Sequence, residues 1–386
     1  MRKWCLSFVL LLAACAPVPA ATPSPLPARS SEAAPITAPN RRRTLLEEAI
    51  GWRCPADFSG QTLTFYNWTT YIAENTLADF ETLCNVRVAY SEFDNEDDML
   101  AAVRADPAAY DVVVPSNTSV ALLAQENLWL PLDLAQLPNL ANISPNLLNP
   151  PYDPGNRFSV PYQWGTIGVG YNITRVRARI ASWQQVFAFE GRIGWLDDNR
   201  ALMSVALALL GYDPASENPA AIAAARDFLI ANSAHVVRLV DDSEGQNLLA
   251  DGTLDLVVEY SGDIFQIIAD CACQDYLYVI PREGALLWVD NLAIPRGARQ
   301  PALALAFIDY LLSPWVAADI SNFTAYASPN QVAINMGLLN ETLLGNTAIY
   351  PDAETRANLF FIERSPQAEA LYNEAWASVR AAIPEP

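Results

Sequence analysis

The residues best placed to do chemistry are a tryptophan and an aspartate in one apolar stretch of the chain. Residues 286–295 read Leu-Leu-Trp-Val-Asp-Asn-Leu-Ala-Ile-Pro, a pattern that predicts a buried strand. Trp288 and Asp290 are two positions apart, so both side chains point to the same face of that strand. A buried carboxylate needs a partner, because burying it alone is costly in free energy.

Two interpretations of Asp290 are compatible with this stretch. In the first, which is the commoner role of a lone aspartate, its carboxylate accepts backbone N–H groups and fixes a neighbouring loop. In the second, the carboxylate and the indole together bind a cation from outside the chain, since an aromatic face also attracts cations. The rest of the sequence favours the second interpretation.

The segments that precede this stretch predict a parallel α/β sheet. Strands and helices alternate at 63–68, 74–83, 86–90, 97–104, 110–115 and 121–126. This order implies parallel strands, with ligands bound at their carboxyl ends. Trp68, Tyr71 and Ser116 all lie at such ends.

The second half of the chain supplies further polar and aromatic side chains at the ends of expected elements. Residues 158–171 are strand-like, with glycines and apolar alternation that suit a crossing between two lobes. Asp198 precedes a helix expected at 201–210, where its ordinary role is an N-cap worth about 1 kcal/mol. Tyr260 ends a strand expected at 254–260, and Tyr326 lies in an aromatic loop.

Composition excludes several classes of function. The 386-residue chain has a formal charge of −20, which argues against nucleic acid and for cationic or neutral partners. Lys3 is the only lysine, so a P-loop lysine and Schiff-base chemistry are excluded. The only histidine, His235, weakens any case for a catalytic triad or a histidine-ligated metal. We therefore expect no enzymatic activity, cofactor or metal.

The N-terminus has the features of a targeting segment. Arg2 and Lys3 precede a short apolar run, and Leu12-Ala13-Ala14-Cys15 looks like a bacterial lipobox. This predicts a signal peptide at 1–14, lipidation of Cys15, and a tether rich in proline and alanine over 15–57. An ordinary signal peptide, cut near Ala20, is the alternative.

Four cysteines remain after export, and an even number suggests two disulfides in an oxidising compartment. Cys54 precedes the first strand and Cys84 ends the first helix, so this pair is able to meet. Cys271 and Cys273 either form a very tight ring or pair elsewhere. As a zinc motif, C-x-C with no second pair is weak.

Five motifs together resemble the spermidine/putrescine-binding periplasmic proteins of ABC importers. They are Phe65-Tyr66-Asn67-Trp68, residues 110–116 (Tyr-Asp-Val-Val-Val-Pro-Ser), Pro161-Tyr162-Gln163-Trp164-Gly165, residues 288–295 and Tyr350-Pro351-Asp352-Ala353-Glu354. The resemblance implies an α/β, two-lobed periplasmic-binding-protein fold of type II. Each lobe is then a mainly parallel sheet flanked by helices, hinged by crossover strands. Lobe 1 is expected at 58–162 and 291–326, and lobe 2 at 163–290 and 327–386.

The same resemblance implies a slot for a linear polyamine, with aromatic rings along its methylenes and carboxylates at its ammonium groups. In this role Trp68 and Trp288 flank the chain of the ligand, while Asp290 and Asp198 hold its two ends. The complete ligand-binding set implied is Trp68, Tyr71, Ser116, Asp198, Tyr260, Trp288, Asp290 and Tyr326.

The sequence departs from the family pattern at four positions. Tyr260 stands where a tryptophan is common, Ala201 where an acid is expected, Thr118 where a tyrosine is expected, and Ile362 near an expected glutamine. The pocket thus loses one carboxylate and some aromatic surface. Glu259, Asp263 and Glu363 are candidates to compensate. Amine binding survives these changes, whereas the identity of the amine stays open.

The sequence therefore predicts an extracytoplasmic, lipid-anchored and monomeric receptor for a putrescine- or spermidine-like polyamine. It would deliver its ligand to the permease subunits of an ABC importer and contact the membrane only through its lipid. The alternatives are a receptor for another cationic or amino-containing solute and a sensory module that feeds a signalling partner.

Overall fold

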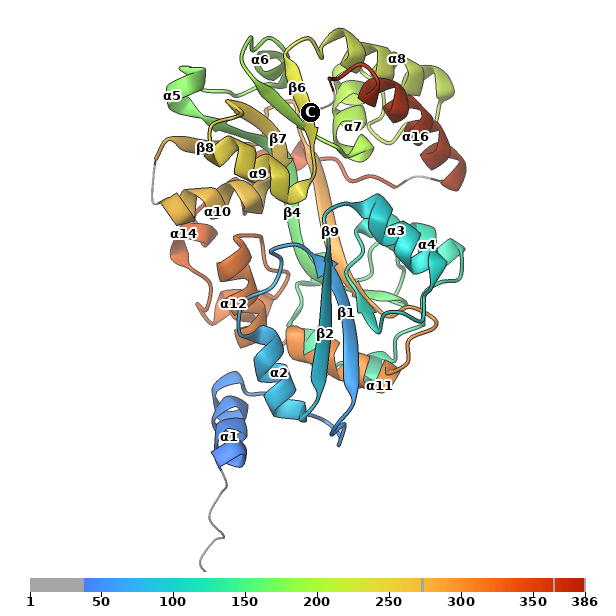
Figure 1. Cartoon of the computed structure of the whole chain (residues 1–386), viewed down its shortest axis with the longest axis vertical. Helices are drawn as coiled ribbons and strands as arrows, with labels where there is room; N and C mark the ends of the chain where they lie inside the picture. Colours follow the sequence, from blue (N-terminus) through green and yellow to red (C-terminus); the bar gives the residue numbers. More distant parts are fainter. Residues whose placement is uncertain (1–37, 272–273, 364, 385–386) are drawn as a thin grey trace, which may run out of the picture.

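The computed structural model describes residues 38–271, 274–363 and 365–384, and it divides into an upper and a lower half in Figure 1. Among the described residues, one sheet of nine strands runs through both halves and is flanked by helices, and two long strands pass from one half to the other. The expected α/β, two-lobed periplasmic-binding-protein architecture is confirmed.

The lower half contains the parallel strands that the first third of the sequence predicts. Strand β1 (Thr62–Trp68) pairs in parallel with β2 (Arg87–Phe93) and with the very short β3 (Val112–Val113). The helices between and after them are α2 (Thr76–Cys84), α3 (Glu96–Ala105) and α4 (Asn117–Gln125). The carboxyl ends of these strands therefore face the upper half (Figure 1).

The upper half has its own parallel strands, in the order β7, β5, β6. These are β5 (Ile193–Leu196), β6 (Val236–Val240) and β7 (Leu256–Tyr260). Helices α9 (Asp242–Ala250) and α10 (Ser261–Cys271) pack on this sheet, while α7 (Asn199–Leu209) packs with α8 (Pro219–Ala231) and α16 (Pro366–Arg380). The short helices α5 (Ile173–Val176) and α6 (Trp183–Phe187) complete this end.

Two antiparallel strands join the halves. Strand β4 (Ser159–Asn172) pairs with β9 (Leu286–Ala293) from Ser159 to Ile167, and its far end pairs with β7 and β8 (Tyr276–Val279). The carboxyl end of β9, at Ala293, pairs with Val113 of β3 in the lower half. Most of the stretch at 286–295 is thus strand β9, which spans both halves, so its side chains lie where the halves meet.

The remaining elements belong mainly to the lower half. They are the 3-10 helices Leu134–Gln136, Pro138–Asn142 and Pro145–Leu147, and the helices α11 (Pro301–Leu311), α12 (Pro314–Thr324), α13 (Gln331–Asn335), α14 (Glu341–Leu344) and α15 (Ala353–Ala357). Ala318 of α12 packs with Ala333 and Leu339. This packing places α13 and Leu339 against α12, whereas α16, farther along the chain, packs with α7 and α8 of the upper half.

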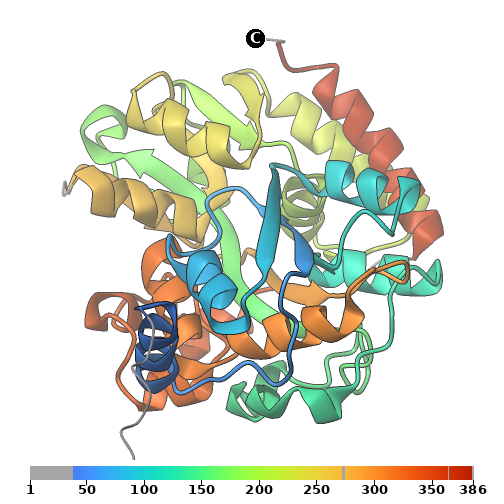
Figure 2. The same ribbon diagram turned by 60° about the horizontal axis from the view of Figure 1, so that its bottom comes forward.

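The end of the expected tether forms a helix instead of an extended segment. Helix α1 (Ala38–Ile50) packs on α2 and α12, where Leu46 and Ile50 meet the core (Figure 2). Apolar side chains at helical spacing within 15–57 explain the difference, since they can be buried against the fold. Cys15 and the rest of the expected signal peptide and tether lie outside the described residues.

A disulfide joins Cys54 and Cys84, one of the pairings that the sequence left open. It links the segment before β1 to the end of α2, and Cys273 lies outside the described residues. Among the described residues no single helix is long and apolar enough to cross a membrane. The bent pair α11 and α12 passes the same test by length and composition, with 72° between the two helices.

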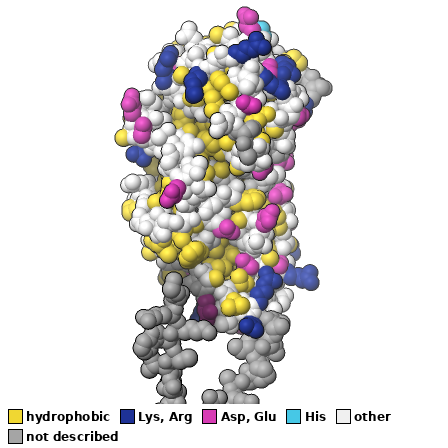
Figure 3. All heavy atoms as spheres, turned by 90° about the vertical axis from the view of Figure 1, so that its left-hand side faces the viewer, with side chains coloured by type: hydrophobic (Ala, Val, Ile, Leu, Met, Phe, Trp, Pro, Cys, Tyr) yellow, Lys and Arg dark blue, Asp and Glu magenta, His cyan; other side chains and the backbone are white. Residues whose placement is uncertain are grey.

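The surface carries its cations unevenly. On the face in Figure 3, most of the arginine side chains of the described residues lie towards the two ends of the molecule, with acidic and uncharged side chains between them. The exposed large apolar side chains include Trp315, Phe323 and Met336, which come from α12 and the end of α13.

Candidate functional site

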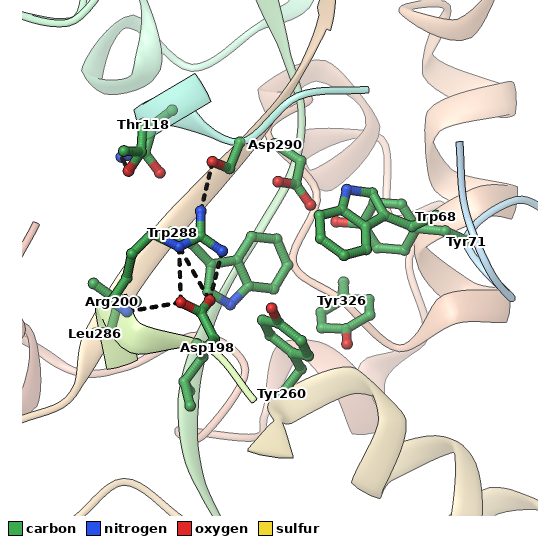
Figure 4. A pocket seen from close by; sticks show the side chains of 13 residues that line it. Trp68, Tyr71, Thr118, Asp198, Arg200, Tyr260, Leu286, Trp288, Asp290 and Tyr326 are labelled. Carbon is green, nitrogen blue, oxygen red and sulfur yellow. Dashed lines mark hydrogen bonds and ion pairs between the residues drawn. The ribbon is translucent and has the colours of Figure 1, made fainter. Parts of the chain in front are cut away.

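The structure brings all eight predicted site residues to one pocket where the two halves meet (Figure 4). Its free volume is about 30 Å³, enough for roughly two or three water molecules. The lining side chains are Trp68, Tyr71, Ser116, Asn117, Thr118, Ile167, Asp198, Arg200, Tyr260, Leu286, Trp288, Asp290 and Tyr326. This grouping fits the predicted site, although which of these residues touch a ligand stays a prediction.

Each half contributes to the pocket through the ends of its strands and the starts of its helices. Trp68 ends β1, and Ser116 is the N-cap of α4, accepting from the Ser119 N–H. Asp198 is the N-cap of α7, and Tyr260 ends β7. The crossing strand β9 presents Trp288 and Asp290 to the same pocket, as its alternation predicts.

Five aromatic side chains form a continuous wall. The Trp288 ring lies 5.1 Å from Tyr326, 5.8 Å from Tyr260 and 6.5 Å from Tyr71, measured between centroids. Tyr260 in turn lies 6.3 Å from Trp68. The indole of Trp68 is fixed because its N–H donates to the Val114 carbonyl at 3.1 Å. Such a wall offers both van der Waals contact and ring faces for a cation.

Two glycines leave the space that these rings occupy. Gly165 of β4 pairs across the sheet with Trp288, and a Cβ on Gly165 would lie 2.6 Å from the indole Cζ2. A Cβ on Gly262 would likewise lie 2.4 Å from the ring of Tyr326. The Tyr326 hydroxyl donates to Asp263 at 2.7 Å. The glycine in the motif 161–165 is therefore a requirement of the aromatic wall.

The environment of Asp290 separates the two interpretations of this residue. Asp290 is buried, with 6% of its surface exposed, and within the described residues no backbone N–H donates to its carboxylate. Burial raises the pKa of Asp290 well above its ordinary value, and the nearby Glu96 raises it further. A hydrogen bond with Tyr71 and the charge of Arg200 lower the pKa in part.

Asp153 shows what a structural buried aspartate looks like in the same fold. Its carboxylate accepts the backbone N–H groups of Arg157, Phe158 and Ser159, together with the Ser159 hydroxyl, at 2.8–3.3 Å. Among the described residues, Asp290 has no comparable set of backbone donors. Its charge is thus only partly compensated, by Tyr71 and Arg200, which favours a cation from outside the chain.

Asp198 is both a helix cap and a member of an ion-pair cluster. Its carboxylate accepts the Arg200 backbone N–H at 2.8 Å and the Arg200 Nε–H at 2.9 Å. From α7, Arg200 reaches the lower half, where Nη1 donates to the Ser116 hydroxyl at 2.8 Å and lies 3.5 Å from Glu96 Oε2. Glu96 also accepts from the Ser116 hydroxyl at 2.8 Å. The cluster therefore bridges the two halves beside the pocket; Figure 4 shows Arg200 and Asp198 of this cluster.

Sequence reasoning missed Arg200, Glu96 and Asn117. Asn117 accepts from the Val289 N–H and donates to the Ile362 carbonyl, so it holds β9 in place. Only the position of Arg200, two residues after the capping Asp198 at a helix start, was a signal in the sequence. Which acid Arg200 pairs with across the halves is a tertiary property.

Of the four positions that depart from the family pattern, Tyr260 belongs to the aromatic wall of the pocket. Thr118 lines the pocket, whereas Ala201 and Ile362 are buried away from it. None of the three proposed compensating acids lines the pocket either. Asp263 acts only indirectly, through its hydrogen bond with Tyr326.

A larger cavity of about 250 Å³ adjoins the pocket, and we name it the acidic vestibule. The two share Thr118, Asp198, Arg200 and Tyr260. Eight carboxylates line the vestibule against two guanidinium groups: Asp94, Glu96, Asp97, Asp98, Asp197, Asp198, Asp241 and Glu369, with Arg200 and Arg380. Such an excess of negative charge attracts cations towards the pocket.

Comparisons with known proteins agree with this geometry. The family model described as bacterial extracellular solute-binding protein matches residues 75–342. The spermidine/putrescine-binding periplasmic protein of Escherichia coli is 32% identical over 337 residues, covering 86% of this chain and 95% of its own. The chain belongs to the spermidine/putrescine-binding family of extracellular solute-binding proteins. This family consists of binding proteins rather than enzymes, and it acts outside the cytoplasm.

Two further members of the family show the same extent of similarity. The putrescine-binding periplasmic protein SpuD of Pseudomonas aeruginosa is 31% identical over 359 residues, covering 87% of this chain and 96% of its own. The solved structure of a putative spermidine/putrescine ABC transporter protein from Listeria monocytogenes superposes with a TM-score of 0.77 at 31% identity. That match covers 83% of this chain and 98% of the other.

Proposed function

We propose that this protein captures a polyamine in the pocket between its lobes and delivers it to the permease of an ABC importer. The observation that carries the proposal is Asp290, a buried carboxylate with no backbone donor among the described residues, set against an aromatic wall. A primary ammonium supplies the missing charge, and the methylenes of a polyamine match the rings.

The surroundings of the pocket support a cationic ligand as well. The acidic vestibule lies next to the pocket, and the whole chain carries a formal charge of −20. A negatively charged approach raises the local concentration of cations and their association rate. Residues of both halves line the pocket, so a bound ligand stabilises the closed arrangement of the lobes.

Calorimetry with putrescine, spermidine, spermine, arginine and lysine tests this proposal. We expect at least one of the three polyamines to bind more tightly than either amino acid, because the carboxylate of an amino acid meets an acidic site. The melting temperature should rise with the concentration of that polyamine, as binding to the native state requires. Tighter binding of arginine or lysine, or no heat with any amine, would refute the polyamine proposal.

The anchoring of the receptor is a separate part of the proposal, supported by Leu12-Ala13-Ala14-Cys15 and the segment that follows it. Cys15→Ser should abolish metabolic labelling with a radioactive fatty acid and leave the precursor uncleaved, because the modified thiol is absent. Ser7→Ala, within the apolar part of the signal peptide, is the matched control and should label normally. Persistent labelling of the Cys15→Ser protein would show that the lipobox interpretation is wrong.

A further inference from the structure

Arg200 lies between the pocket and the acidic vestibule, and it lines both. It extends from the second position of α7, which belongs to the upper half. Its guanidinium contacts Asp198 of its own half and Ser116 and Glu96 of the lower half. The side chain is 12% exposed. Arg200 is therefore a buried cation that joins carboxylates of both lobes.

The charge of this side chain is permanent. Although burial opposes it, the charges of Asp198 and Glu96 hold the pKa of Arg200 well above its ordinary value. Asp198 is engaged by both Nε and Nη2 in the forked geometry typical of arginine and carboxylate. An ammonium group arriving at Asp198 would meet a like charge at close range, which opposes its binding.

The acids beside the pocket thus divide into two kinds. Asp198 and Glu96 already have a cation within the chain. Asp290 forms no ion pair with any described arginine. Of these three acids, Asp290 is thus the one that can pair with the charge of a ligand. It lies at the end of the pocket that the aromatic side chains enclose.

We propose that Arg200 is a specificity-determining residue that takes the place of a second ligand ammonium, so that this site recognises amines through one terminal ammonium at Asp290. This inference rests on the proposed function and adds that the site binds short primary alkylamines whether or not they carry a second ammonium. The interlobe bridge that a second ammonium would supply is already made by Arg200.

Putrescine and n-butylamine provide the probe, because they share a four-carbon chain and differ in the second ammonium. We expect the dissociation constants of the two amines for the mature wild-type protein to differ by less than about fivefold. In Arg200→Met the side chain stays unbranched but loses its charge, which leaves Asp198 and Glu96 for the second ammonium. Calorimetry should then show that putrescine binds about 10- to 100-fold more tightly than n-butylamine, the difference expected of one charged hydrogen bond.

Two control variants separate the charge of Arg200 from general effects. Arg200→Lys keeps the cation and should keep the wild-type ratio of the two affinities. Arg192→Met removes a comparable forked pair with Asp255, at 2.6 Å on the surface of the upper half, and should also leave the ratio unchanged.

The outcomes distinguish this inference from the proposed function. A wild-type protein that prefers putrescine by more than about fivefold overturns the inference, even if Arg200→Met fails to fold. A folded Arg200→Met protein with an unchanged ratio overturns it as well, while amine binding itself stands. If neither amine, spermidine nor spermine binds the wild type, the proposed function and the inference both fail.

Discussion

Asp290→Asn is expected to weaken polyamine binding by about 30-fold to several thousand-fold, the range found when one partner of a desolvated charge pair is removed. The substitution keeps the shape of the side chain and removes its charge. Asp290 lies in the pocket without a backbone donor among the described residues, so the fold does not need its charge. Calorimetry measures the affinity, and thermal unfolding without ligand measures stability.

Asp153→Asn is the matched control, since Asp153 is equally buried and accepts backbone N–H groups. It should lower the melting temperature and leave the affinity of the folded protein unchanged. The Asp290→Asn protein should show the opposite pattern. If instead a well-folded Asp290→Asn protein binds polyamines as tightly as the wild type, the proposed site is wrong.

The same aspartate predicts the pH dependence of binding. Because burial raises its pKa well above the ordinary value, Asp290 holds a proton in the unliganded protein at pH values where an exposed aspartate is ionised. The ligand ammonium, with a pKa near 10, favours the ionised carboxylate, so binding releases a proton. Affinity should therefore rise with pH up to the raised pKa and then level off.

Calorimetry in two buffers of different ionisation enthalpy measures this release directly. The Asp290→Asn protein should release fewer protons than the wild type. The stability of the unliganded protein changes with pH in the opposite direction to the affinity. The contribution of Asp290 to stability is fully present below its unfolded pKa and is lost as the pH rises through its folded pKa. A wild-type affinity that falls between pH 5 and pH 7 would contradict the assignment.

Trp288→Ala is expected to weaken binding by about 30- to 1,000-fold, as for a central aromatic contact. The indole lies at the centre of the wall, with Tyr71, Tyr260 and Tyr326 around it. Its loss removes contact with the methylenes and one ring face. Because no charge changes, the preference between ligands of equal charge should stay as in the wild type, measured by calorimetry with putrescine and cadaverine.

Trp315→Ala serves as the control, because Trp315 is 49% exposed on α12 and lines no part of the pocket. It should bind polyamines as tightly as the wild type. Trp288→Phe keeps a ring and should recover part of the lost affinity. Equal affinities of the Trp288→Ala and wild-type proteins for polyamines would show that the aromatic wall is not part of the ligand-binding site.

The sequence alone determined the elements that carry the site. Alternation in residues 286–295 predicted strand β9 and the shared face of Trp288 and Asp290, because side-chain direction along a strand depends on local spacing. The capping position of Asp198 and the strand-end positions of Trp68 and Tyr260 were likewise predictable. Hydrophobic periodicity is a local property, and it needs no knowledge of what packs opposite.

Residues distant in the sequence decided the electrostatics of the pocket, and only the tertiary structure shows them. Glu96 and Arg200 belong to different halves, and no local pattern predicts that they lie 3.5 Å apart. Whether Asp198 holds a ligand or an arginine depends on that contact. Likewise, Asp153 and Asp290 are both aspartates near apolar residues in the sequence. One is surrounded by backbone donors and the other is not, because the path of the folded chain fixes which groups surround each carboxylate.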